Sequence, residues 1–200
     1  EKFYLADTGF EDLQLVSYEH IKKARSSKVK PYPLSNNWLD IDLSEQNIDI
    51  EAAIPDALVK NAEMMLQGYT TLRGKSGVDI IKKWSDDLPD WRLIDDWKWS
   101  SRFSYQVISK RGVDGAGFRW FYRDFLSESS TYCPKINELD LVAMMDNIGN
   151  KWFDLSMLLK EISELDQPNG KFTEASSIAN EIFTLEKDFY NLIINSINKI

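Results

Sequence analysis

Cysteine and histidine are almost absent from this sequence. Among its 200 residues there is one cysteine, Cys133, and one histidine, His20. A single cysteine cannot form an internal disulfide, which suits a reducing compartment, and we expect the protein to be cytoplasmic. A single histidine excludes a metal site with several histidine ligands, and a histidine-dependent triad would have to use His20. The sequence offers no motif for a cofactor, and we predict none.

Positive charge and long apolar runs are also scarce. The 24 lysines and arginines are outnumbered by 32 acidic residues, which gives a net charge of −8 at pH 7. This balance argues against nucleic acid and against an anionic membrane surface as partners. No apolar run approaches the roughly 20 residues that a membrane-spanning helix needs. The acidic surface fits a small cationic acceptor well and an acidic carrier protein poorly.

The N-terminal part of the sequence predicts a small β element. The hydrophobic content of 43%, with 12% aromatic residues, is typical of a globular protein. Two short apolar runs, residues 2–6 and 13–16, predict a hairpin, and Ser17 predicts the N-cap of the helix that follows. Residues 28–48 are interpreted as a linker with one short strand at residues 38–43.

Beyond the linker, apolar residues recur at helical spacing. Six helices are predicted, at residues 54–66, 77–88, 92–110, 118–132, 137–165 and 173–200. The Gln-Pro-Asn-Gly turn at residues 167–170 would fold the last two helices into an antiparallel pair. The predicted fold is therefore mainly α, a bundle of about six helices with a small β remnant at the N-terminus. Residues 1–48 and 49–200 are the two predicted domains.

Two groups of residues suggest chemistry but are better explained by structure. Asp86, Asp87 and Asp90 match the Asp-Asp-x-x-Asp pattern of isoprenoid synthases, in which carboxylates on one helix face bridge magnesium to a diphosphate. Pro89 would break that helix between the pair and the third acid. Five tryptophans could form a platform for a sugar or base, although aromatic residues at helical spacing are expected in the core. They are Trp84, Trp91, Trp97, Trp99 and Trp120.

The most informative stretch is a glycine-rich run that leads directly into a helix. Glycines stand at positions 112, 115 and 117, and an aromatic and charged helix is predicted after them. The run does not match a phosphate-binding loop, because it lacks a lysine followed by serine or threonine. Arg119, Tyr122 and Arg123 lie on adjacent turns and could line a pocket for a carboxylate or phosphate. Alternatively, Arg119 and Glu128 simply hold helices together.

The same stretch carries a family resemblance. Residues 115–128 read Gly-Ala-Gly-Phe-Arg-Trp-Phe-Tyr-Arg-Asp-Phe-Leu-Ser-Glu. This motif resembles the glycine-rich turn and Phe-Arg-x-x-Tyr-x-x-Phe-Leu-x-Glu helix of the butirosin biosynthesis protein H family, whose helical C-terminal domain follows a papain-like domain. Supporting matches to the helical domain lie at residues 61–66, 74–91 and 148–152. Residues 4–7 and 24–27 resemble the end of the papain-like domain.

The resemblance implies acyl transfer in antibiotic biosynthesis, from an acyl carrier protein or another acyl thioester to a small amine. The cysteine and histidine of the implied Cys-His-Asp site would precede Glu1, in the missing papain-like region. We therefore expect the chain to be the C-terminal part of an acyltransferase or amide-forming enzyme, and not competent alone. Asp7 stands where the acid that orients the histidine is found, and it is the predicted catalytic residue.

The helical domain would then shape the substrate pocket or the interface of a homodimer. Arg119, Tyr122 and Glu128, from the motif that carries the resemblance, are the predicted substrate-binding residues. Cys133 and His20 do not match the catalytic positions; a structural cysteine and an exposed helical histidine are expected. The alternative function is that of a non-catalytic helical module for binding or interaction.

Overall fold

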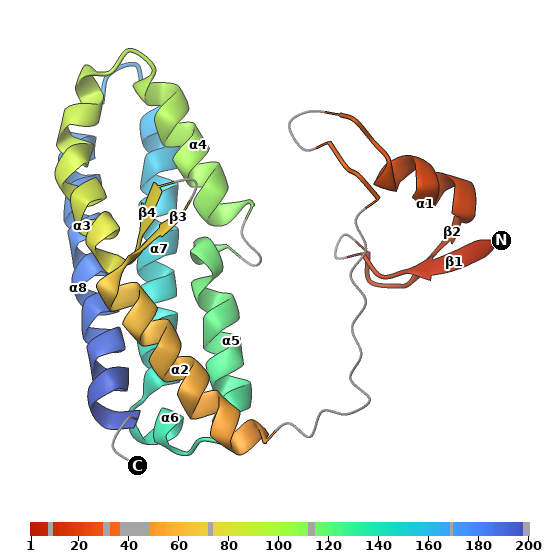
Figure 1. Ribbon diagram of the computed structural model, residues 1–200. Helices are drawn as coiled ribbons and strands as arrows, with labels where there is room; N and C mark the ends of the chain where they lie inside the picture. The colour runs from red at the N-terminus through yellow and green to blue at the C-terminus, as the bar shows by residue number, and fades with distance from the viewer. Residues whose placement is uncertain are drawn as a thin grey trace. The chain divides into compact units, whose positions relative to one another are not determined.

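The fold is mainly α-helical. The structure, a computed structural model, describes residues 1–7, 10–29, 33–36, 49–71, 74–111, 115–168 and 170–197. These residues contain eight α-helices and two antiparallel sheets of two strands each (Figure 1). The predicted class, mainly α with a small β part, is confirmed. The chain divides into two compact units, Glu1–Asn47 and Ile48–Ile200.

The first unit consists of a hairpin and a short helix. Strand β1 (Lys2–Leu5) pairs with β2 (Gln14–Ser17), and α1 (Tyr18–Arg25) follows at once. The predicted cap is confirmed, because the backbone N–H of His20 donates to Ser17 Oγ at 3.3 Å. All four side chains of β1 are exposed. The strand predicted at residues 38–43 lies outside the described residues.

The second unit begins with a helix and a hairpin. Helix α2 (Ile50–Gln67) is capped by Asp49, and Gly68 ends it at φ +70°. Strands β3 (Tyr69–Thr71) and β4 (Gly74–Ser76), which the sequence analysis missed, come directly afterwards. A Cβ on Gly68 would lie only 2.9 Å from the carbonyl oxygen of Ser76, so glycine lets the end of β4 close on the helix end.

The predicted helix at residues 92–110 begins later than expected. Helix α3 (Val78–Asp87) runs into the 3-10 helix η1 (Leu88–Leu93), and α4 (Trp97–Ser109) starts only after extended backbone at Ile94. Two apolar side chains of α4, Phe103 and Val107, are exposed. The buried side chains of this helix are Ser101, Tyr105 and Ile108. Ser101 is buried at no polar cost, because its hydroxyl donates to the Trp97 carbonyl.

The last helices form the centre of the bundle. After α5 (Arg119–Ser129) and α6 (Lys135–Glu138), the long helices α7 (Leu141–Glu164) and α8 (Lys171–Ile197) pack as the predicted antiparallel pair (Figure 1). The helix predicted from residue 137 is in fact two helices. Asp140 separates them with φ +54°, a left-handed conformation that aspartate tolerates better than most residues.

Helix α7 packs against α4, α5 and α8, while α2 and α3 pack on α8. The largest fully buried side chains include Leu155 and Leu159 of α7, and Phe172 and Phe189 of α8. Each such side chain contributes roughly 1.5–3 kcal/mol by leaving water. None of the helices in the described ranges combines the length and the apolar composition that a bilayer crossing requires.

Candidate functional site

The glycine-rich run contains an unusual backbone turn. Ala116, Gly117 and Phe118 have φ angles of +50°, +56° and +69°, so three consecutive residues are left-handed. For residues with a side chain this conformation costs roughly 1–2 kcal/mol each, and it normally occurs at single positions. We call residues 115–118 the left-handed turn; residues 112–114 of the run lie outside the described residues. Such strain persists only where the surroundings fix it, and it is often found at functional sites.

Arg119 fixes this turn from the inside. Its Nη1 donates to the carbonyl oxygen of Gly117 at 2.7 Å. Its Nε and Nη2 both lie 2.8 Å from Oε1 of Glu186 on α8. The same carboxylate oxygen accepts a hydrogen bond of 2.7 Å from Trp152 Nε1 on α7. The first residue of α5 is therefore attached to α7 and α8 through one fully buried carboxylate.

The neighbourhood of this carboxylate also holds polar atoms without a partner. Among the described residues, Glu186 Oε2 and the hydroxyl of Tyr122 are buried and make no hydrogen bond. Burial raises the pKa of the Tyr122 phenol. Burial and then the negative charge of Glu186 raise the pKa of the Tyr190 phenol, while Arg119 opposes the shift. Both phenols therefore stay neutral in the folded protein over the physiological pH range.

A pocket of about 410 Å³ opens beside the left-handed turn. Its lining comes from α3, α4, the left-handed turn, α5 and α7: Trp84, Phe103, Ser104, Val107, Ile108, Gly117, Phe118, Arg119 and Trp152. The rings of Trp84 and Trp152 stack with centroids 6.1 Å apart and planes 13° from parallel. The guanidinium carbon of Arg119 lies 4.8 Å from the Trp152 ring centroid. The pocket thus has an aromatic floor, and Arg119 is the one charged residue that the described part of the chain contributes to its lining.

The structure brings only part of the predicted substrate site together. Arg119 lines the pocket, but the Tyr122 ring packs between α5 and α8, against Phe189 at a centroid distance of 6.1 Å. Glu128 is exposed and lies nine residues further along α5. At 1.5 Å per residue this separation is about 13 Å along the helix axis. Arg119 does hold helices together, as the alternative prediction states, through its ion pair with Glu186 on α8.

Glu186, like Trp152 of the pocket floor, is a site residue that sequence reasoning missed. It lies 67 residues from Arg119, and no helical spacing rule connects positions so far apart. The only available signal was a glutamate within an otherwise apolar stripe of the last helix, Ile182, Glu186, Phe189 and Tyr190. A charge at such a position is rarely buried unless it is paired.

Asp7, the predicted catalytic acid, is exposed and follows β1 in the first unit. It borders a hollow of about 310 Å³ together with Phe10, Glu11 and Asp12. His20 is exposed on α1, as expected of a helical surface histidine. Cys133 is free and buried in the helical unit. The catalytic role of Asp7 and the non-catalytic roles of His20 and Cys133 stay predictions.

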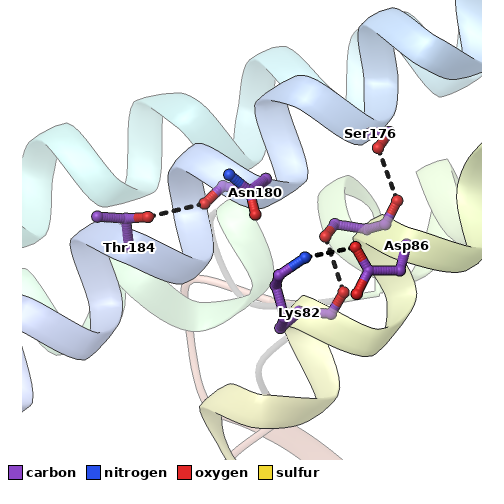
Figure 2. A network of polar contacts seen from close by, with 6 residues as sticks. Lys82, Asp86, Ser176, Asn180 and Thr184 are labelled. Atoms are coloured by element: carbon purple, nitrogen blue, oxygen red, sulfur yellow. Dashed lines mark hydrogen bonds and ion pairs between the residues drawn. The ribbon is translucent and has the colours of Figure 1, made fainter.

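The aspartate pattern does not form a metal face. Asp86 and Asp87 are exposed and form ion pairs with Lys82 and Lys83 one turn earlier on α3, the first of which is drawn in Figure 2. The α-helix ends at Asp87, so Asp90 lies in η1. In the part of the chain that the structure describes, no group of three or more metal-binding side chains could hold an ion. The break of the α-helix next to Pro89 is the one that the sequence predicts.

The tryptophans are distributed between core and surface. Trp84, Trp91, Trp97 and Trp120 pack against the hydrophobic core. Trp99 is exposed and stacks on Phe103 with centroids 4.8 Å apart. The indole of Trp120 lies so close to α7 that a Cβ on Gly149 would be 2.5 Å from its Nε1. The five residues do not form one platform; Trp84 joins the pocket floor with Trp152, which the prediction did not include.

Comparison with known families assigns residues 19–193 to a domain of unknown function, DUF4872. The chain belongs to this family. The matched region of this DUF4872 chain contains the left-handed turn, Arg119, Trp152 and Glu186, and thus every residue of the pocket. No curated protein and no solved structure matches the chain.

Proposed function

We propose that this chain is the helical accessory part of a cysteine-dependent acyltransferase or amide-forming enzyme that acts in the cytoplasm, and that its pocket holds part of the substrate. The observation that supports this proposal is a coincidence of two features. The motif that carries the family resemblance, residues 115–128, also builds the left-handed turn and supplies Arg119 to the pocket. A sequence signature and a binding geometry thus fall on the same residues.

In this proposal the nucleophile and the base come from a papain-like region outside these residues. The chain itself has one cysteine and one histidine; Cys133 is buried, and His20 is exposed in the other unit. Asp7 would orient the external histidine. The acyl donor would be a thioester, for example on an acyl carrier protein, and the acceptor a small amine.

The predicted substrate-binding residues then take different parts. Arg119 contacts the ligand in the pocket. Tyr122 does not contact the ligand; its ring packs against Phe189 and holds α5 on α8. The exposed carboxylate of Glu128, far from the pocket, would be free to attract a cationic acceptor.

The test is incubation of the longest protein that the gene encodes with acyl carrier thioesters, followed by intact mass measurement. We expect an acyl adduct on a cysteine, and the adduct should persist in Cys133→Ser. The Val107→Trp variant, which fills the pocket from an exposed position, should reduce the adduct at least tenfold. Met157→Trp places a tryptophan at a similarly exposed site outside the pocket and should not reduce the adduct. Absence of an adduct, or its loss in Cys133→Ser, would refute the enzyme proposal.

A second candidate is a non-catalytic binding module. The observation in its favour is that the described lining of the pocket is aromatic and apolar apart from Arg119 and Ser104, and it holds no general base beside Ser104, whose hydroxyl donates to the carbonyl oxygen of Ser100. Ligand binding that depends on the pocket, without any adduct on the longest protein, would establish this second candidate instead.

A further inference from the structure

The charge of Arg119 is already balanced inside the protein. The guanidinium contacts Glu186 Oε1 through two nitrogens at 2.8 Å, and the side chain of Glu186 is completely buried. The pair is therefore neutral as a unit. An anionic ligand in the pocket would be attracted by the arginine and repelled by the carboxylate behind it, while losing its own hydration. A cationic ligand would meet the guanidinium first. The electrostatics thus favour an uncharged ligand.

Arg119 nevertheless keeps hydrogen-bonding capacity. A guanidinium has five N–H groups, and the contacts to Gly117 and Glu186 use one each on Nε, Nη1 and Nη2. One N–H on each terminal nitrogen remains. The side chain lines the pocket and is 23% exposed, so these donors are within reach of a bound molecule. A neutral acceptor with two lone pairs, such as a carbonyl oxygen, matches them.

The floor of the pocket selects a flat group. Trp84 and Trp152 lie nearly parallel, and the planar guanidinium covers part of the Trp152 ring. The exposed rings of Phe103 and Phe118 stand in the lining on α4 and at the left-handed turn. Aromatic side chains arranged in this way favour a planar apolar group through offset or edge contacts. The volume of about 410 Å³ is in the usual range of small-molecule sites.

We infer that the pocket binds an uncharged planar acyl group, aromatic or conjugated, whose carbonyl oxygen accepts hydrogen bonds from Arg119. This inference rests on the proposed function for the origin of the acyl group, but binding itself requires no catalysis. Glu186 and Trp152 are the positioning residues: they hold the guanidinium in place and set its charge balance. The earlier expectation of a carboxylate or phosphate ligand is replaced by that of a neutral carbonyl.

Three probes that share one ring separate charge from shape: benzamide, benzoate and benzylamine. Binding to the whole 200-residue chain would be followed through the indole N–H signals of ¹⁵N-labelled protein, with Trp84→Phe and Trp152→Phe to assign the two floor signals. We expect benzamide to shift both signals and to bind at least tenfold more tightly than either charged probe. Equal or tighter binding of benzoate or benzylamine, or no binding of benzamide, would overturn the inference.

Matched variants locate the binding site. Val107→Trp should weaken benzamide binding at least tenfold, whereas Met157→Trp should leave it unchanged; equal effects of the two would contradict the inference. Arg119→Lys keeps the positive charge but not the fork of donors, and it should weaken benzamide more than toluene. A similar loss for both probes would show that the carbonyl is not recognised.

The two proposals can fail separately. Pocket-dependent benzamide binding without any acyl adduct would uphold this inference and refute the enzyme proposal. An acyl adduct without benzamide binding would uphold the enzyme proposal and refute this inference.

Discussion

Helix α8 is held on two sides by different kinds of polar contact. Towards α3, Ser176 Oγ donates to the carbonyl oxygen of Ser85 at 2.7 Å, and the charged groups of α3 stay at the surface, as Lys82 and Asp86 show (Figure 2). Towards α5 and α7, the fully buried Glu186 receives Arg119 and Trp152. The same helix thus has a neutral interface with charges around it and an interface with a charge at its centre.

The difference matters because burial changes what an ion pair contributes. Exposed pairs contribute roughly 0–1 kcal/mol, since water screens them and long side chains lose entropy. A buried pair adds little over well-packed apolar residues, but removal of one partner leaves the other charge uncompensated. The α3 side should therefore tolerate substitution, and the α5 side should tolerate only paired changes.

The largest expected effect is the loss of Glu186. Glu186→Leu leaves the partly buried Arg119 without its counter-charge and Trp152 Nε1 without an acceptor, and we expect the free energy of unfolding to fall by about 3–5 kcal/mol. Urea titration followed by circular dichroism measures the change. Glu181→Leu is the matched control on the same helix: its exposed pair with Lys151 should contribute less than about 1 kcal/mol.

A double variant makes the test sharper. Arg119→Leu combined with Glu186→Leu removes both charges and should be more stable than either single variant. If the double variant is as unstable as the sum of the two single losses, the pair is not the reason for the sensitivity of this side.

The next effect concerns the contact of α5 with α7. Gly149→Ala would normally stabilise a helix by up to about 1 kcal/mol. Here the new Cβ would fall 2.5 Å from Trp120 Nε1, so the indole must move, and we expect a loss of about 1–3 kcal/mol. Thermal unfolding gives the comparison with Asp154→Ala at an exposed position of the same helix, which should change stability by no more than about 0.5 kcal/mol. An increase in Tm for Gly149→Ala would contradict the close contact.

A smaller effect, of opposite sign, is expected at Tyr122. Its buried hydroxyl makes no hydrogen bond with the described residues, so Tyr122→Phe should be neutral or stabilising by about 1 kcal/mol at pH 7. Burial raises the pKa of Tyr122 and of Tyr190 above the value of about 10 in the unfolded chain. Their contribution to stability is therefore complete below pH 10 and is lost as the pH rises beyond it.

Urea titrations between pH 8 and 11 test this sign. The fall in stability on the alkaline side should be smaller in Tyr122→Phe and in Tyr190→Phe, and smallest in the double variant. An unchanged alkaline fall in the double variant would show that other groups cause it.

The smallest effect is expected on the α3 side. Lys82→Ala removes the exposed partner of Asp86 and should change the free energy of unfolding by no more than about 0.5 kcal/mol. Lys60→Ala, at another exposed helical position, is the control for the change in helix propensity. If Lys82→Ala lowers the free energy of unfolding by more than about 2 kcal/mol, the two sides of α8 do not differ in their tolerance of substitution.

Periodicity in the sequence was sufficient for most helices but not for their ends. The stretches that became α2, α7 and α8 have apolar residues at 3.6-residue spacing, and that spacing directly determines which face is buried. The interruption at Asp140 was not predictable in this way, because one left-handed residue leaves the apolar spacing on either side unchanged. The spacing of apolar residues likewise predicts a helix from residue 92, although the chain is extended at Ile94.

The candidate site was predictable only where it is local. The glycine pattern and Arg119 are neighbours in sequence, so the motif identified the turn and one pocket residue. Glu186, Trp84 and Trp152 reach the site through the packing of α3, α7 and α8, and no local rule contains that information. Glu128 shows the limit: it belongs to the same local motif as Arg119, but it is not among the residues that line the pocket.

The left-handed turn has a consequence for attempts to stabilise this protein. Glycine at positions 116 and 118 would relieve the backbone, so a search for higher thermal stability would favour replacing Ala116 and Phe118. The same exchange would remove a buried methyl group and the phenyl ring beside the pocket. Selection for heat resistance alone would therefore be expected to erode ligand binding here, and variants from such a selection would show the trade-off first at these two positions.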